Sequence, residues 1–178
     1  DQDCQYTVCL RGMVDGEPTV QKRVVTGVAD VVDAYEEYGK YSEYARLDTL
    51  RFIVSNTTEA GIVFDDSDKF EAEPPKTYPG KLCKFLYTRY KHFDGAADKG
   101  LVMLPVELID DNGIHLKECV VKFAKLWNLE EGFLTWLDDA CVFTSTLVDR
   151  IVTGYPRDDA EELWKEFGYR DNIVVTAE

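Results

Sequence analysis

In the stretch "FIVSNTTEAGI", residues 52–62, a short apolar, β-branched run leads directly into consecutive polar side chains and a glycine. The apolar run lacks the alternation of a half-exposed strand, and this pattern predicts a buried strand. Open α/β sheets bind ligands in the crevice beyond the carboxyl ends of their strands. The stretch therefore predicts such a sheet, with a candidate site where this strand ends.

The segments on either side of this stretch alternate between strand and helix patterns. Asp15-Gly16 separates two β-rich runs near the start of the chain and predicts a hairpin. Further elements are expected as helices at 34–47, 79–93, 112–127, 130–142 and 158–167, as strands at 100–109 and 172–178, and as a loop at 65–78. Strands that alternate with helices indicate βαβ units. We therefore expect an α/β fold over 1–178 as a single domain, with a mainly parallel sheet, flanking helices and an N-terminal β-hairpin.

Composition argues against several classes of partner. The 178 residues include 20 Lys and Arg against 34 Asp and Glu, and the net charge of -14 repels nucleic acid and anionic lipid alike. No apolar run approaches the roughly 20 residues of a membrane helix. Five cysteines without a C-x-x-C pair indicate reduced thiols rather than a disulfide framework or a zinc site. We expect a cytoplasmic protein that binds neither nucleic acid nor membrane.

Several familiar catalytic motifs are absent from the sequence. The two histidines, His92 and His115, are isolated, so no metal site is expected. Neither a G-x-S-x-G elbow nor a P-loop occurs. No two of the twelve glycines are two residues apart, so the G-x-G turn that binds a dinucleotide pyrophosphate is not within these residues.

Three polar clusters remain as candidates, and they occupy residues 55–61, 105–113 and 145–152. Each also has a structural interpretation. Asn56 and Glu59 have the spacing of a helix capping box, and Thr146 with Asp149 has a related spacing. Asp149 beside Arg150 also suits a surface ion pair of little energetic value. Spacing alone leaves ligand binding and helix capping both open.

The motifs "RFIVSNTTEAGI", "PVELIDDNG" and "FTSTLVDRIVTGYPRD" together resemble the mannitol dehydrogenase family of polyol-specific long-chain dehydrogenases. The resemblance extends through nearly the whole chain, including "DKFEAEPPKTYPGKL", "HFDGAADKG" and the final "TAE". It implies an N-terminal Rossmann domain that binds NAD, and a mostly helical C-terminal domain that carries a catalytic lysine with Asn and His helpers. The fold expected here is then the later part of a Rossmann-type domain.

The resemblance also implies roles for individual residues. The cofactor crevice would be lined by Ser55, Asn56, Thr57, Thr58, Glu59 and Gly61. The substrate end of the cofactor would meet Glu107 and the Val-Asp-Arg motif formed by Val148, Asp149 and Arg150. An asparagine that holds the reacting oxygen in mannitol enzymes falls on Leu108, so its role does not transfer, whereas Glu107 keeps an acid where the relatives have Asp.

Departures from the family pattern limit what these residues would do alone. The lysine motif reads Lys-x-x-x-x-Asn-x-x-His; Asn112 and His115 have its second spacing, but Glu107 stands in place of the lysine. We expect no catalytic residue within the chain. The glycine-rich βαβ start and the C-terminal domain are expected outside it, which makes the chain an internal fragment that is inactive alone and depends on the missing domain in cis.

The reaction that the resemblance implies is hydride transfer between NADH and the ketone of tagaturonate, giving the sugar acid altronate, with no metal required. Oxidation and reduction of mannonate or mannitol is the alternative within the family. A non-catalytic α/β binding module is an alternative of another class, favoured by the absent phosphate turn. A third is a metal-free active site around Glu59 and Glu107.

Overall fold

Two β-sheets organise the computed structural model, which describes residues 2–147 and 152–177. The four-stranded sheet has the order β2-β1-β7-β6, and the three-stranded sheet has the order β3-β4-β5. The first belongs to a unit made of Asp1–Val31 and Arg150–Glu178, and the second to a unit made of Val32–Asp149. A mixed α/β architecture with parallel strands, helices and an N-terminal hairpin confirms the predicted fold class. That residues 1–178 form part of one Rossmann domain stays a prediction.

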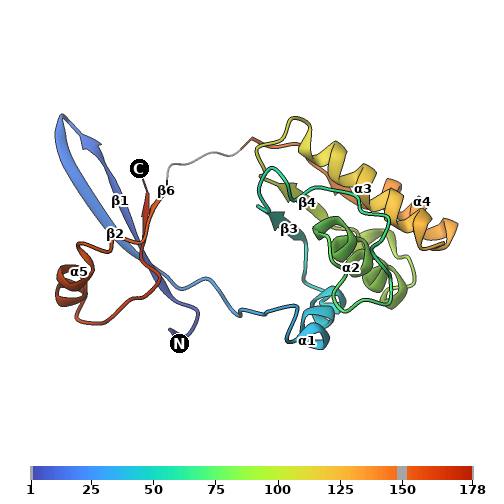
Figure 1. Ribbon diagram of the computed structural model, residues 1–178, viewed down its shortest axis with the longest axis horizontal. Coiled ribbons are helices and arrows are strands. Elements are labelled where there is room, and N and C mark those ends of the chain that lie inside the picture. The colour runs from blue at the N-terminus through green and yellow to red at the C-terminus, as the bar shows by residue number, and fades with distance from the viewer. Residues whose placement is uncertain (1, 148–151, 178) are drawn as a thin grey trace. The chain divides into compact units, whose positions relative to one another are not determined.

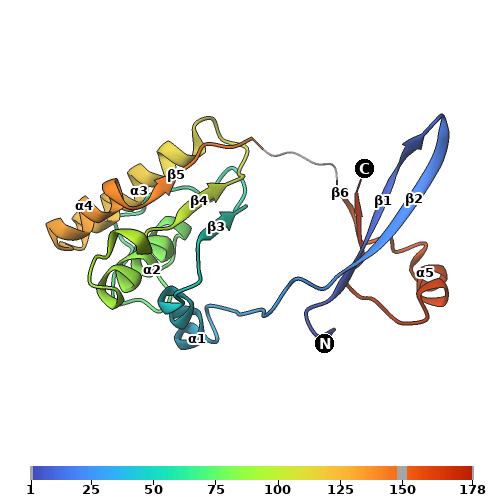
Figure 2. The same ribbon diagram turned by 180° about the vertical axis from the view of Figure 1, so that it is seen from behind.

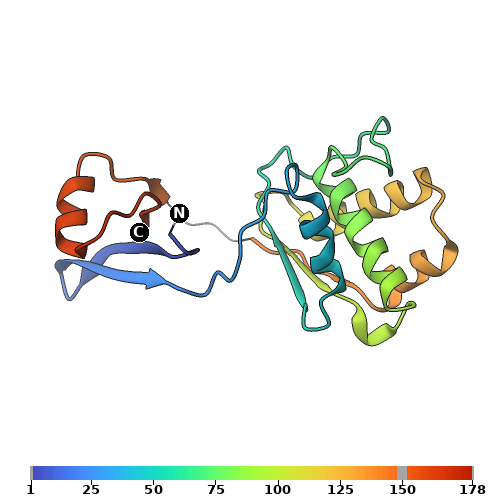
Figure 3. The same cartoon turned by 90° about the horizontal axis from the view of Figure 1, so that it is seen from below.

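The first unit is built on the predicted hairpin. β1 (Tyr6–Val14) and β2 (Glu17–Val25) pair antiparallel around Asp15 and Gly16, whose φ angles of 53° and 86° suit a tight hairpin turn. β7 (Val175–Ala177) runs parallel to β1, and β6 (Val152–Gly154) pairs antiparallel with β7. α5 (Ala160–Phe167) lies beside the hairpin (Figure 3), where Lys22 forms an ion pair with Glu166.

Asp171 joins the two ends of the first unit. Its buried carboxylate accepts hydrogen bonds from the backbone N–H groups of Thr7 and Ile173, both at 2.8 Å, and from Gln2 Nε2 at 2.9 Å. Burial by itself raises the pKa of Asp171, but these hydrogen bonds outweigh burial and the pKa is lowered. The charged form therefore ties together segments that lie far apart in sequence.

The second unit contains the βαβ pattern that the sequence predicts. Its elements are α1 (Tyr38–Glu43), a 3-10 turn (Tyr44–Arg46), β3 (Phe52–Ser55), α2 (Tyr78–His92), a second 3-10 turn (Ala97–Lys99), β4 (Val102–Pro105), α3 (Asn112–Leu126), α4 (Glu131–Asp139) and β5 (Val142–Phe143). The three strands are parallel and adjacent in chain order, with helices in each connection. No helix in the described parts of the chain is long and apolar enough to cross a membrane.

Helices cover one face of the three-stranded sheet (Figure 1, and from behind in Figure 2). The core on that face includes Leu86 of α2, Met103 of β4 and Phe123 of α3, all fully buried. The side chains of Phe52 and Val54, which point to the other face, are 59% and 66% exposed. The prediction that this strand is buried on both faces is therefore wrong. Consecutive strands joined by crossovers of one hand place their helices on one face, so this unit alone leaves the other uncovered.

Arg89 of α2 fixes the loops that lead into β3 and β4. It is 1% exposed, and its guanidinium donates hydrogen bonds to four backbone carbonyl oxygens. The acceptors are Lys99 at 2.6 Å, Leu47 at 2.8 Å, Ala45 at 3.0 Å and Leu50 at 3.3 Å. Burial lowers the pKa of Arg89, and the nearby Asp48 carboxylate opposes this shift. The guanidinium thus replaces secondary structure as the partner of these loop carbonyls.

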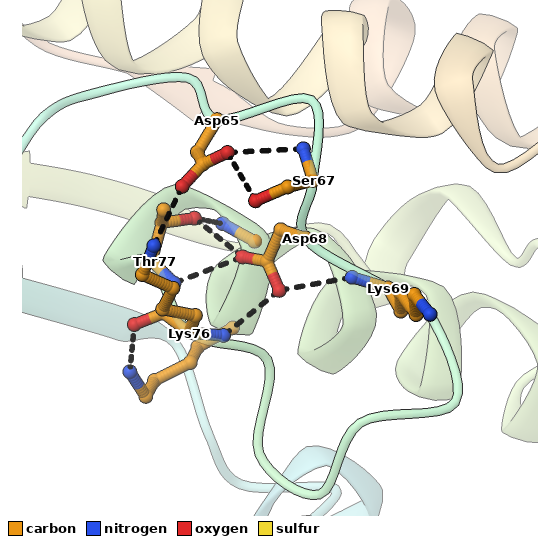
Figure 4. A network of polar contacts seen from close by, with 8 residues as sticks. Asp65, Ser67, Asp68, Lys69, Lys76 and Thr77 are labelled. Atoms are coloured by element: carbon orange, nitrogen blue, oxygen red, sulfur yellow. Dashed lines mark hydrogen bonds and ion pairs between the residues drawn. The ribbon is translucent and has the colours of Figure 1, made fainter.

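The predicted loop at 65–78 is held by the carboxylate of Asp68 (Figure 4). Asp68 is buried and accepts hydrogen bonds from the backbone N–H groups of Lys69, Lys76 and Thr77 and from Thr77 Oγ1. Thr77 in turn caps α2, because its Oγ1 accepts the N–H of Gly80 at 3.1 Å. Pro79 lies in the first turn of α2, as predicted.

Several predicted boundaries are wrong. The helix expected at 34–47 begins only at Tyr38, because the carboxylate of Asp33 accepts the N–H of Tyr35 and its carbonyl accepts that of Glu37, forming a turn. The helix expected at 130–142 ends at Asp139, because Val142 donates its N–H to Leu101 and joins the sheet as part of β5. The strand expected at 100–109 spans only Val102–Pro105.

Candidate functional site

The carboxyl ends of β3, β4 and β5 bring parts of all three predicted polar clusters together. Ser55 and Thr57 come from the end of β3, Glu107 and Asn112 from the segment after β4, and Thr146 from the segment after β5. Hydrogen bonds link residues of these clusters that lie far apart in the sequence. Because the three strands are parallel, these side chains meet at one edge of the sheet, which we call the polar edge.

Glu107 is the centre of the contact between the first two clusters. Its side chain is almost fully buried, with 1% exposure. Oε2 accepts a hydrogen bond from Ser55 Oγ at 3.1 Å, and Oε1 accepts two from Thr57, from N at 3.1 Å and from Oγ1 at 2.9 Å. The carboxylate is therefore directed at the turn after β3, and it holds that turn against the end of β4.

In the turn after β3, some side chains are buried against the protein and others are exposed to solvent. Ser55 is buried and Thr57 half-buried, whereas Asn56, Thr58 and Glu59 are exposed. Thr58 has a positive φ of 72°, and the chain then folds back so closely that a Cβ at Gly61 would overlap Thr57. No helix begins in this turn, so the capping-box interpretation of Asn56 and Glu59 is wrong. Their polar groups are open to a ligand.

Tyr78, the first residue of α2, adds a hydroxyl beside Ser55. Burial raises the pKa of Tyr78 to about 12, the negative charge of Glu107 acts in the same direction, and the Ser55 hydroxyl acts against it. The Tyr78 hydroxyl makes no well-aligned hydrogen bond within the described part of the chain. Tyr78 therefore stays neutral near pH 7 and contributes a hydroxyl without charge.

Asn112 links the second cluster to the third, a role that the sequence did not reveal. Its side chain is fully buried. Nδ2 lies within hydrogen-bonding distance of the carbonyl oxygens of Thr146 at 2.7 Å, Glu107 at 2.9 Å and Pro105 at 3.1 Å, so its two hydrogens are shared among three acceptors. Oδ1 accepts the N–H of Thr146 at 3.1 Å. The Asn-Gly pair predicted only a turn into a helix, because long-range partners leave no local pattern.

The remaining predicted site residues contribute less. Val148, Asp149 and Arg150 lie outside the described residues. Leu108 is 48% exposed and offers no polar side chain where mannitol enzymes are expected to have asparagine. All five cysteines are free, and burial raises the pKa of Cys83 and Cys141. Within 2–147 and 152–177, no three His, Cys, Asp or Glu side chains gather in a way that would hold a metal ion.

The polar edge therefore offers hydrogen-bonding groups in two layers. Glu107 and Asn112 are buried and satisfied by the chain itself, so they fix the shape of the edge. Asn56, Thr58 and Glu59 are exposed and provide an amide, a hydroxyl and a carboxylate. Such groups suit a ligand that is rich in hydroxyl groups, because each offers an acceptor, and the amide and hydroxyl also offer donors.

Comparison with known proteins gives matches over the whole chain. The family model described as the mannitol dehydrogenase Rossmann domain matches residues 2–178. Altronate oxidoreductases of Bacillus subtilis (strain 168) and Shigella flexneri are each 47% identical over 178 residues, which is 100% and 99% of this chain respectively. The chain spans 37% of the length of each.

Solved structures share the fold. Mannitol 2-dehydrogenase of Pseudomonas fluorescens, solved as a ternary complex with NAD and D-mannitol, aligns with a TM-score of 0.79 and 22% identity. A D-sorbitol dehydrogenase in substrate-free form aligns with the same TM-score and 20% identity. Each alignment covers 99% of this chain and 37% of the solved one.

Proposed function

The chain belongs to the mannitol dehydrogenase family, and on this premise we propose that it is part of an NAD-dependent oxidoreductase that interconverts tagaturonate and altronate by hydride transfer. The observation that carries the proposal is the polar edge, where three clusters meet beyond the carboxyl ends of parallel strands. That is where open α/β sheets bind their ligands. The names of the 47% identical relatives support the choice of substrate.

NAD would be held at the polar edge by the exposed residues Asn56, Thr58 and Glu59, which fit the hydroxyl groups of a ribose. When bound, NADH supplies the hydride. The pyrophosphate requires a different site, because the twelve glycines of the chain include no G-x-G turn. We place that turn, and the lysine that donates a proton to the developing alkoxide, in other parts of the parent protein.

The residues of this chain would orient and stabilise rather than react. Glu107 holds Thr57 and Ser55 in place, so the exposed side chains between and beyond them are presented in a fixed arrangement. A preorganised arrangement favours transfer because the reacting groups need no further ordering. We also propose a cytoplasmic location, which the five free thiols support, and Val148, Asp149 and Arg150 as contacts at the substrate end.

The substrate proposal is tested with the full-length parent protein and three ketones, those corresponding to altronate, mannonate and mannitol. Loss of NADH absorbance gives kcat/KM for each. We expect kcat/KM for tagaturonate to exceed that for the other two ketones by about 100-fold, a difference of about 2.7 kcal/mol in transition-state binding. Equal or faster reduction of another ketone would contradict the proposed substrate.

Replacing Glu59 by alanine tests the cofactor role of the turn after β3. We expect the NADH dissociation constant of the parent to rise about tenfold, because one charged hydrogen bond to the cofactor is lost. The melting temperature should hardly change, since Glu59 is exposed and caps no helix. Glu36→Ala, which removes another exposed carboxylate, from the turn before α1, is the control. A fall of many degrees in melting temperature with normal NADH binding would assign Glu59 a structural role instead.

A further inference from the structure

The backbone ladder between β4 and β5 is very short. It pairs only Val102 with Val142 and Met103 with Phe143, followed by one hydrogen bond from Thr144 N to Met103 O at 3.1 Å. Beyond that point the strands no longer bond through their backbones among the described residues. Something else must therefore fix the distance between the two strand ends at the polar edge.

Beyond the end of the backbone ladder, the side-chain amide of Asn112 connects the segments that follow β4 and β5. It accepts the N–H of Thr146 and donates to the carbonyl of the same residue, which is how a neighbouring strand would pair with it. The same amide nitrogen bonds the carbonyls of Glu107 and Pro105. Thr146 Oγ1 also donates to Pro105 O at 2.5 Å. Asn112 is thus bonded at once to the segments that follow β4 and β5.

Gly113 brings the backbone of α3 into direct contact with the segment after β5. A Cβ at this position would overlap the carbonyl of Thr144 and would lie 3.0 Å from Ser145 N. The φ of Gly113 is not in the left-handed region, so space rather than backbone conformation demands glycine here. Any larger residue would push the segment after β5 away from α3.

We infer that Asn112 and Gly113 are positioning residues for the reaction of the parent protein. Together they set the separation between Glu107 and Thr146 and thereby the width of the polar edge. This inference rests on the proposed function, which places the reacting end of the ligand at that edge. A shift of the edge by the radius of one methyl group would misplace the ligand relative to the groups that act on it.

A purely structural role makes a different prediction from a positioning role. If the two residues only stabilise the fold, their replacement lowers the melting temperature, and the folded fraction keeps its normal kcat. If they position the edge, kcat of the folded enzyme falls while NADH still binds to the turn after β3, which neither residue touches in the described contacts. The split between kcat and cofactor affinity therefore separates the two roles.

The experiment compares Gly113→Ala with Gly39→Ala in the full-length parent. Gly39 lies in α1, and a Cβ added there would meet nothing within 4 Å, so its replacement is a matched control. Gly113→Ala is expected to lower kcat at least about tenfold, with the NADH dissociation constant changed by less than about threefold. Gly39→Ala should keep kcat within about twofold of the unmodified enzyme.

Thr146→Val provides a milder variant in case Gly113→Ala does not fold. It removes one hydroxyl and its bond to Pro105 O, but keeps the shape of the side chain and both backbone bonds to Asn112. We expect kcat to fall about threefold with an unchanged melting temperature. Full kcat in the folded variants, with an active unmodified enzyme, would overturn this inference alone. An unmodified enzyme that binds NADH but reduces none of the three ketones would overturn the proposed function and the inference together.

Discussion

Replacing Arg89 by methionine is expected to lower the free energy of unfolding by about 3–5 kcal/mol. Methionine fills much of the same volume, so the loss comes from polar groups rather than from a cavity. Four buried or half-buried carbonyl oxygens, those of Ala45, Leu47, Leu50 and Lys99, lose the guanidinium as a donor, and of these Leu47 O keeps a second donor in the N–H of Leu50. Urea unfolding of the 178-residue chain, followed by circular dichroism, measures the change.

Two further variants identify the cause of the loss. Arg46→Met removes an exposed guanidinium that pairs with Glu43, and it should change the free energy of unfolding by less than about 0.5 kcal/mol. Arg89→Lys keeps the charge but cannot reach four acceptors with one ammonium group, so it should retain most of the loss. A loss of less than about 1 kcal/mol for Arg89→Met would show that water replaces the guanidinium.

Arg89 shows that local sequence patterns predict a helix but not the long-range hydrogen bonds of its buried polar side chains. Its position on the helix at 79–93 follows from periodicity, and the helix is confirmed as α2. A charged residue on the inner face has no local explanation, because its acceptors lie at 45–50 and at Lys99 in other loops. Periodicity reports which face is buried, but the partners of a buried polar group depend on tertiary structure.

The boundaries that the sequence misplaced have a similar cause. Helical spacing continues through Val142, yet its N–H bonds Leu101 and places it in β5. Likewise, the apolar run at Phe52 and Val54 has the composition of a strand buried on both faces, although this unit covers only one of them. Local propensity is weak enough for tertiary pairing to override it.

The location of the polar edge was predictable from the sequence. Which of its side chains are buried and which are exposed was not. Two of the three polar clusters follow predicted strands, which indicated one edge of a parallel sheet, and the contacts of Glu107 confirm that these two meet. The sequence did not distinguish Ser55 and Thr57, which bond to Glu107, from Asn56 and Glu59, which are exposed. That distinction depends on the turn that Thr58 makes with a positive φ.

Replacing Glu107 by leucine is expected to have the second large effect. Leucine leaves Ser55 Oγ, Thr57 N and Thr57 Oγ1 without their acceptor. Glu107 is only 1% exposed, so little water can reach this position to replace the carboxylate. The free energy of unfolding should fall by about 2–4 kcal/mol, because the buried Ser55 hydroxyl and the half-buried donors of Thr57 lose their partner. In the parent protein the turn after β3 would lose its anchor, and NADH affinity should fall about tenfold or more.

Glu107→Gln separates the shape of this contact from its charge. The glutamine Oε1 can accept both hydrogen bonds from Thr57, and the Ser55 hydroxyl can rotate to accept one from Nε2. If Glu107 only positions the turn, this variant should recover most of the stability and NADH affinity that leucine loses, with kcat within about threefold of normal. If the carboxylate itself accepts or donates a proton in the reaction, the variant should stay folded and bind NADH while kcat falls at least about 100-fold. We expect the first result, because three hydrogen bonds from the chain already occupy the carboxylate and its 1% exposure keeps it away from a ligand.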